Sequence, residues 1–266
     1  MIKTFLLAGT AGLALVGAAT AADLPRRMAP PMLPPVPVFT WTGAYFGINA
    51  GYIASDRAVV NTVAVTPVGA GALASGAVPT SRNLNTDGFT GGGQVGYNYQ
   101  VGNFVLGVEA DAAYTDMDRT VGFVGTGGVT TFHRQSLDYL GTVRGRVGLA
   151  FDRVLVYGTG GFAYGDVSYR TATLSPAGAV LAGGARSGLE TGWAAGGGIE
   201  YALPTDSFLN FFRSSAVTLK AEGLYYDLGR RTIAVGAAGI GTALASRYET
   251  NGFIARVGLN YKFGTF

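Results

Sequence analysis

The chain lacks cysteine altogether and has a single histidine, His133, among its 266 residues. The absence of cysteine excludes disulfide bonds, thiolate nucleophiles and cysteine-based zinc sites. It also suits an exported chain that crosses an oxidising compartment before it folds. Charge is scarce too: charged residues make up 13% of the chain and the net charge is +3, with no run of Lys or Arg. Such a chain has no electrostatic footprint for nucleic acid, and we expect no nucleic-acid partner.

Long hydrophobic runs are missing after the first twenty residues. Lys3 precedes an apolar stretch over 4–17, which is too short to span a bilayer as a helix, and Ala19-Thr20-Ala21 follows. These features predict a signal peptide over 1–21, cleaved after Ala21. The alternative, a membrane-anchoring helix, is disfavoured because Asp23 follows at once.

The segment 22–40 holds six of the ten prolines, so it predicts an extended periplasmic linker without a core of its own. It leads to the first strand, and a contact with peptidoglycan through Arg26 and Arg27 is an alternative role. The remainder, 41–266, has the composition of a folded domain. Hydrophobic residues reach 48% of the whole chain and mean hydropathy is +0.29, which excludes disorder for most of it.

From Trp41 onward the apolar residues recur with a period of two, which is typical of β-strands. In the last such segment Val257, Leu259 and Tyr261 alternate with polar or small residues. The weakest alternation is in the fifth segment, where we expect Val156, Phe162 and Tyr164 to point outward. The pattern predicts eight strands, within 44–52, 89–100, 104–114, 137–151, 154–169, 193–201, 219–225 and 253–263.

Aromatic side chains on the apolar face gather at the two ends of these strands. One set is Tyr52, Phe89, Tyr114, Tyr139, Tyr164, Trp193, Tyr225 and Phe253, and the other is Tyr97, Tyr99, Phe104, Phe151, Tyr201, Tyr261 and Phe263. Two aromatic girdles that flank an apolar band are typical of the exterior of a membrane barrel. A soluble barrel would point its large apolar residues inward instead.

The opposite face of the same strands carries charge, which no dry apolar core could hold unpaired. We predict an interior charge network of paired cations and anions. Its members are Glu109, Asp111, Arg144, Arg146, Glu200, Lys220, Glu222, Arg256 and Lys262.

The connections alternate in length. Those at 101–103 and 151–153 are tight turns, whereas 55–88, 115–136, 166–190 and 229–250 are long and rich in small residues. A membrane barrel has short periplasmic turns and long external loops, so the fold class we predict is an all-β, eight-stranded antiparallel up-and-down transmembrane β-barrel. The connection 203–215 is longer than a turn, and its phenylalanines are expected to lie against the headgroups.

Several motifs resemble those of the alphaproteobacterial family of small porin-like outer-membrane proteins, which includes surface antigens and haemin-binding barrels. They are Ala22-Asp23-Leu24-Pro25, Trp41-Thr42-Gly43-Ala44-Tyr45-Phe46-Gly47, the stretch 91–98, Thr142-Val143-Arg144-Gly145-Arg146-Val147-Gly148, the stretch 192–201, Lys220-Ala221-Glu222 and the ending 257–263. The resemblance implies an eight-stranded barrel built by the outer-membrane assembly machinery, but no single activity. Family chains end at the aromatic residue that would be Phe263, whereas this chain continues to Phe266, so either could be the assembly signal.

The sequence offers only two weak candidates for a catalytic or ligand-binding motif. Gly91-Gly92-Gly93 has no helix after it and reads as strand packing, not as a nucleotide loop. His133, with Arg134, Ser136 and Asp138 nearby, could act in catalysis or ligate haem, but a polar surface role is expected. We therefore expect no enzyme, no metal, no cofactor and no catalytic residue.

Three functions stay open. We favour a structural surface barrel that contributes to envelope integrity; the alternatives are a narrow porin-like channel and a loop-borne haem or surface receptor. The expected location is the Gram-negative outer membrane, after cleavage of the signal peptide. The expected partners are outer-membrane lipid and lipopolysaccharide, with the assembly machinery and periplasmic chaperones during biogenesis.

Overall fold

The computed structural model describes residues 39–56, 58–204, 207–212, 214–237 and 241–264. The predicted signal peptide, most of the linker including Arg26 and Arg27, and Phe266 lie outside these residues. The body that is described belongs to a single compact unit, Val38–Phe266.

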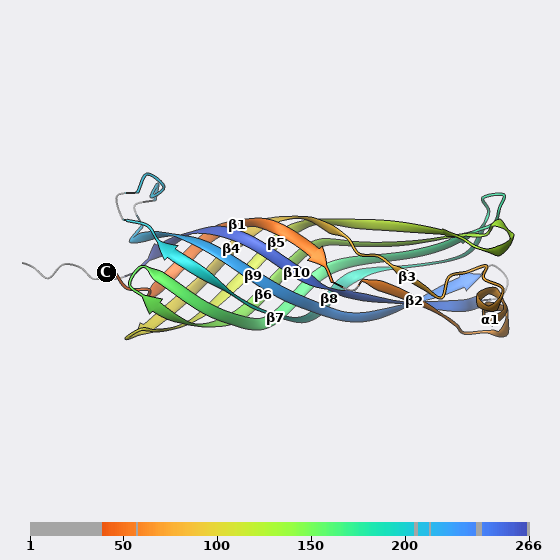
Figure 1. Cartoon of the computed structure of the whole chain (residues 1–266), viewed down its shortest axis with the longest axis horizontal. Helices are drawn as coiled ribbons and strands as arrows, with labels where there is room; N and C mark the ends of the chain where they lie inside the picture. Colours follow the sequence, from red (N-terminus) through yellow and green to blue (C-terminus); the bar gives the residue numbers. More distant parts are fainter. Residues whose placement is uncertain (1–38, 57, 205–206, 213, 238–240, 265–266) are drawn as a thin grey trace, which may run out of the picture. The chain divides into compact units, whose positions relative to one another are not determined.

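Strands dominate the described chain, as the period of two predicts (Figure 1). The elements are β1 (Gly43–Ser55), β2 (Val59–Ala64), α1 (Pro67–Ala74), β3 (Ser81–Asn83), β4 (Asp87–Val101), β5 (Phe104–Val124), η1 (Thr126–Gly128), β6 (Thr130–Phe151), β7 (Val154–Leu174), β8 (Val180–Ala202), β9 (Ala216–Ala237) and β10 (Gly241–Phe263).

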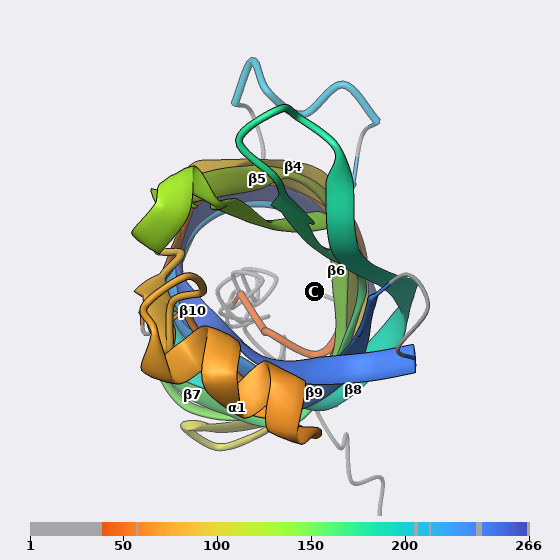
Figure 2. The same ribbon diagram turned by 90° about the vertical axis from the view of Figure 1, so that its right-hand side faces the viewer.

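Eight of the strands close into a ring (Figure 2). The order β1-β4-β5-β6-β7-β8-β9-β10 is antiparallel throughout, and β1 pairs with β10 to complete it. The short strands β2 and β3 add to the far part of β10, where Tyr248 pairs with Val60. The eight-stranded up-and-down barrel is therefore confirmed. No helix in the described ranges is long and apolar enough to cross a membrane.

The apolar face of the strands points away from the ring axis. Val95, Val108 and Val147, which lie between the two aromatic girdles, expose 57%, 62% and 58% of their surface. In β7, Val156 and Phe162 are exposed as well. A soluble protein would not leave such a band open to water, whereas lipid covers it without cost.

One predicted orientation is wrong. In the segment 137–151, alternation predicts that Leu137 shares the lipid face with Tyr139, but Leu137 is buried inside the barrel at 2% exposure. The pairing of β6 with β7 shifts between Leu137 and Tyr139, and that of β5 with β6 shifts between Tyr114 and Met117. Such a bulge inserts an extra residue and reverses which side chains face inward. The alternation therefore changes phase just beyond the outer girdle.

Three of the long connections, 115–136, 166–190 and 229–250, also differ from expectation, because most of their length is strand. The β5–β6 pairing continues to Val124 and Thr130, and the β7–β8 pairing continues to Leu174 and Val180. Antiparallel hairpins rich in Val and Thr satisfy their backbone groups without leaving the sheet, so the sheet runs well past the girdle. In 115–136 and 166–190 only the tips lie outside the strands, whereas 55–88 contains α1 between β2 and β3.

At the other end, the connection between β8 and β9 packs on the outside of the barrel. The Phe212 ring lies 4.7 Å from that of Tyr261 and 5.8 Å from that of Phe46, centre to centre. This cover explains why Tyr261, expected in the exposed girdle, is only 8% exposed.

Substitution of Val147 by Arg tests the lipid face. We expect it to lower the free energy of unfolding in lipid by about 2–4 kcal/mol, because a cation near mid-bilayer is poorly solvated. Tyr114→Arg, at the outer girdle, is the matched control and should cost about 0–1 kcal/mol. Equal urea midpoints for the two variants in lipid vesicles would contradict the assigned depth.

Candidate functional site

The predicted interior charges lie in the membrane-spanning half of the barrel, and strand register brings several of them face to face. Glu109 on β5 is the cross-strand partner of Arg144 on β6. Glu222 on β9 pairs in the same way with Arg256 on β10. On β8, Glu200 is the partner of Lys220. Inward alternation thus aligns opposite charges on neighbouring strands, which is a stabilising arrangement.

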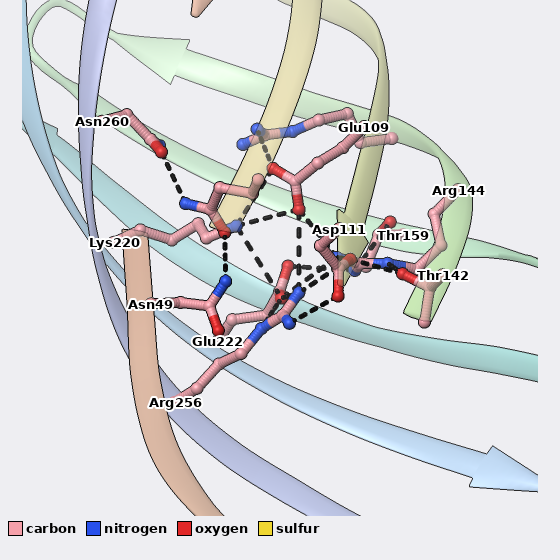
Figure 3. Close-up of polar contacts among 12 residues, drawn as sticks. Asn49, Glu109, Asp111, Thr142, Arg144, Thr159, Lys220, Glu222, Arg256 and Asn260 are labelled. Atoms are coloured by element: carbon pink, nitrogen blue, oxygen red, sulfur yellow. Dashed lines mark hydrogen bonds and ion pairs between the residues drawn. The ribbon is translucent and has the colours of Figure 1, made fainter. Parts of the chain in front are cut away.

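Arg144 stands at the centre of the network (Figure 3). Its guanidinium donates to Glu109 at 2.7 Å, to Asp111 at 3.0 Å and to Glu222 at 3.1 Å. Its side chain has no exposed surface, so every contact is made out of water. Charge-assisted hydrogen bonds of this kind are the strongest available to a buried guanidinium.

The other cations surround the same carboxylates. Arg256 donates from Nη1 to Asp111 at 2.9 Å and from Nε to Glu222 at 2.8 Å. Lys220 Nζ lies 2.9 Å from Glu109. Each of these carboxylates therefore accepts from at least two cations, and the strands β5, β6, β9 and β10 are joined across the lumen.

Arg146 extends the network towards β8. It donates to Glu200 at 2.8 Å and lies 3.4 Å from Glu109. With it, the structure brings together four cations and four anions, all buried: Arg144, Arg146, Lys220 and Arg256 with Glu109, Asp111, Glu200 and Glu222. The formal charges cancel, which is the condition for burying them together.

Lys262 is the one predicted member that the structure does not bring into the network. Its Nζ lies 5.7 Å from the centre of the Phe39 ring, at the periplasmic end of β10. Within the described part of the chain it forms no ion pair with any of the four anions.

Two buried tyrosines that sequence reasoning missed complete the network. Tyr45 donates to Glu109 at 2.7 Å and accepts from Arg146 at 2.8 Å. Tyr157 donates to Glu222 at 2.9 Å, and Arg146 stacks 3.9 Å above its ring. A signal existed in each case, because each tyrosine lies on the inward parity next to an outward apolar residue. Gly96 makes room for Tyr45, since a Cβ there would meet the ring at 2.4 Å.

Apolar layers lie on both sides of the charges. On the periplasmic side a cluster around Trp41, Val105 and Leu155 fills the barrel mouth. Towards the extracellular end, the side chains that point into the barrel are apolar and form a larger cluster that includes Ile53, Leu140 and Leu224. The charged section is thus enclosed between two apolar clusters.

His133 was expected on the polar surface of the connection 115–136. It lies instead inside the outward extension of the barrel, at 1% exposure. Its Nδ1 lies 3.0 Å from Thr171 Oγ1 and 3.4 Å from Tyr248 OH, and its Nε2 has no partner among the described residues. Arg134 and Asp138 are exposed on the outer face instead. The side chains that a catalytic or haem role would combine therefore do not converge. Across the described residues, no group of three or more His, Cys, Asp or Glu side chains could hold a metal ion.

Burial lowers the pKa of His133 to about 4, and the nearby Arg82 contributes in the same direction. The unfolded chain, with the ordinary pKa near 6.5, binds a proton first as the pH falls. We therefore expect the extension to lose stability between pH 6.5 and pH 4. Amide hydrogen exchange in 119–135 and 168–173 measures this loss.

His133→Gln should remove the loss in that window and leave the pH dependence of the carboxylates unchanged. An identical pH profile for the variant and the native chain would contradict a neutral, buried His133.

Comparisons with known proteins agree with this architecture. Residues 8–263 match the family described as outer membrane protein beta-barrel domain. The 31 kDa outer-membrane immunogenic protein of Brucella melitensis is 33% identical, over 98% of this chain and all of that protein. The 25 kDa outer-membrane immunogenic protein of the same species is 26% identical, over 98% of this chain and 99% of that protein.

Among solved structures, the outer membrane protein OprG of Pseudomonas aeruginosa is 15% identical, covers 84% of this chain and 98% of its own, and has a TM-score of 0.47. The family match and the Brucella relative, both nearly full length, decide the identity. The chain belongs to the family of outer-membrane β-barrel proteins and resides in the outer membrane of Gram-negative bacteria.

Proposed function

We propose that the protein is a non-conducting structural barrel that contributes to the integrity of the outer membrane. The observation that carries this proposal is the neutral ion-pair network around Arg144, enclosed between two apolar layers. An eight-stranded barrel has an interior just wide enough for side chains to fill, and here those side chains bind one another.

The energetics favour a closed lumen. A permeating ion would have to separate buried pairs such as Arg144–Glu222, and breaking a buried pair typically costs about 3–5 kcal/mol. It would then cross the apolar layer that includes Leu140 and Leu224, where it finds no ligands. Both barriers must be crossed in series, so a channel is the weaker reading.

The partners that we propose follow from the same role. Outer-membrane lipid and lipopolysaccharide surround the exposed bands, and the assembly machinery with periplasmic chaperones delivers the chain. Phe263, at the end of β10, is a candidate for the assembly signal. A peptidoglycan contact through Arg26 and Arg27 stays a proposal, since both lie outside the described residues.

Single-channel recording in a planar bilayer tests the closed lumen. The native protein should conduct little or nothing, whereas Glu222→Ala should open small, noisy currents that depend on salt. The variant removes one of the anions that Arg144, Lys220 and Arg256 share, so the network keeps an uncompensated positive charge, and hydrating that charge is cheaper than leaving it unpaired.

Asp118→Ala is the matched control, because it removes a carboxylate from an exposed ion pair with Arg134 outside the barrel. It should leave the conductance unchanged. Large, steady currents from the native protein that neither substitution alters would instead assign a narrow porin-like channel.

A further inference from the structure

A patch of arginine and serine lies on the outer surface of the barrel, beyond the outer aromatic girdle. Arg134 on β6 is the direct cross-strand partner of Arg170 on β7. One step nearer the membrane, Ser136, Ser168 and Ser187 lie side by side on β6, β7 and β8. All five side chains alternate with inward ones such as Gln135 and Tyr169, so they share the outward face.

This patch, the arginine–serine hollow, is concave. It has a volume of about 350 Å³. Small side chains leave the space, and the longer arginines border it. The polar residues that line it are Arg134, Ser136, Ser168, Arg170, Arg186 and Ser187.

The charges of the hollow are not balanced. Two like charges placed directly opposite each other, as Arg134 and Arg170 are, destabilise a sheet. Asp118 pairs with Arg134, but in the described chain neither Arg170 nor Arg186 takes part in an ion pair. The next outward carboxylates, Asp138 and Asp166, lie on the membrane side of the serines. A net positive rim is thus left facing away from the bilayer.

The height of the hollow above the membrane fits one source of anions. On β7, Ser168 and Arg170 lie four and six residues beyond Tyr164 of the outer girdle. At about 3.3 Å per residue and a strand tilt near 40°, they stand roughly 10 and 15 Å above it. Aromatic girdles mark the headgroup level, so this is the layer of acidic, phosphorylated sugars in the outer leaflet.

We propose that the arginine–serine hollow binds phosphate and carboxylate groups of the lipopolysaccharide sugars next to the bilayer. This inference rests on the proposed function in treating the protein as a structural part of the envelope. The guanidinium of Arg170 can offer a phosphate two parallel hydrogen bonds, and Arg134, whose Nε and Nη2 donate to Asp118, keeps the N–H groups of Nη1 for the anion. The serine hydroxyls supply further donors. A bound anion also relieves the repulsion between the two arginines.

Binding of purified lipopolysaccharide to the refolded barrel tests the proposal. Native mass spectrometry compares the full-length mature protein with the double variant Arg134→Gln/Arg170→Gln, using lipopolysaccharide that retains lipid A and the inner sugars. We expect the variant to bind at least about tenfold more weakly. The control, Arg230→Gln/Arg247→Gln, removes two exposed arginines from the opposite strands β9 and β10 and should change the affinity less than twofold.

A second arm uses lipopolysaccharide stripped of phosphate, which should bind the native protein about tenfold more weakly. Equal losses in both double variants, or equal affinity for the stripped ligand, would overturn the site. All variants must show the heat-dependent gel mobility of a folded barrel. Conductance in lipopolysaccharide-free bilayers reports on the lumen alone, so failure of the closed-lumen proposal and failure of this site are separate results.

Discussion

The burial of Arg144 among three carboxylates is the constraint on which the rest of the structure depends. A guanidinium with no exposed surface is tolerable only if each donor finds an acceptor, and Glu109, Asp111 and Glu222 supply them. Glu109 and Asp111 lie on β5, the neighbour of β6, whereas Glu222 comes from β9, three strands away from β6 in the ring. The network therefore fixes the relative positions of β5, β6 and β9 at the same time as it fills the lumen.

The outer and inner faces of the barrel carry opposite kinds of side chain, because each side chain must match its surroundings. Outside, lipid accepts only apolar side chains, and the aromatic girdles limit the band. Inside, polar groups are allowed because they satisfy one another, and apolar clusters lie at both ends of the charged section. Beyond the outer girdle the sheet continues as hairpins whose outward face becomes polar again. The two proposals thus divide the barrel: we propose a closed lumen within the membrane, and an arginine–serine hollow that binds the sugar layer above it.

Much of this could be predicted from alternation, because a period of two assigns each side chain to a face without any knowledge of neighbours. What alternation cannot give is the position of a side chain along the barrel axis. It correctly turned Lys262 inward, but it could not show that Lys262 lies too near the periplasmic end to reach the anions. Alternation also cannot detect a bulge, and a bulge turns Leu137 inward. Nor can it show that a polar segment continues the sheet, as 130–136 does, so the burial of His133 inside the extension was not predicted. Tyr45 and Tyr157 were missed because only charged side chains were considered as members of the interior network.

The central claim, that the charged section of the lumen is closed to water, is tested most directly by proton exchange at the guanidinium groups of Arg144 and Arg256. Nitrogen-15 NMR of the folded protein in micelles at pH 8 resolves their Nε–H signals if the protons leave slowly. The account predicts sharp signals that exchange orders of magnitude more slowly than those of exposed Arg134, and that disappear into fast exchange in Glu222→Ala. Exchange of Arg144 and Arg256 in the native protein as fast as that of Arg134 would show a hydrated lumen and contradict the account.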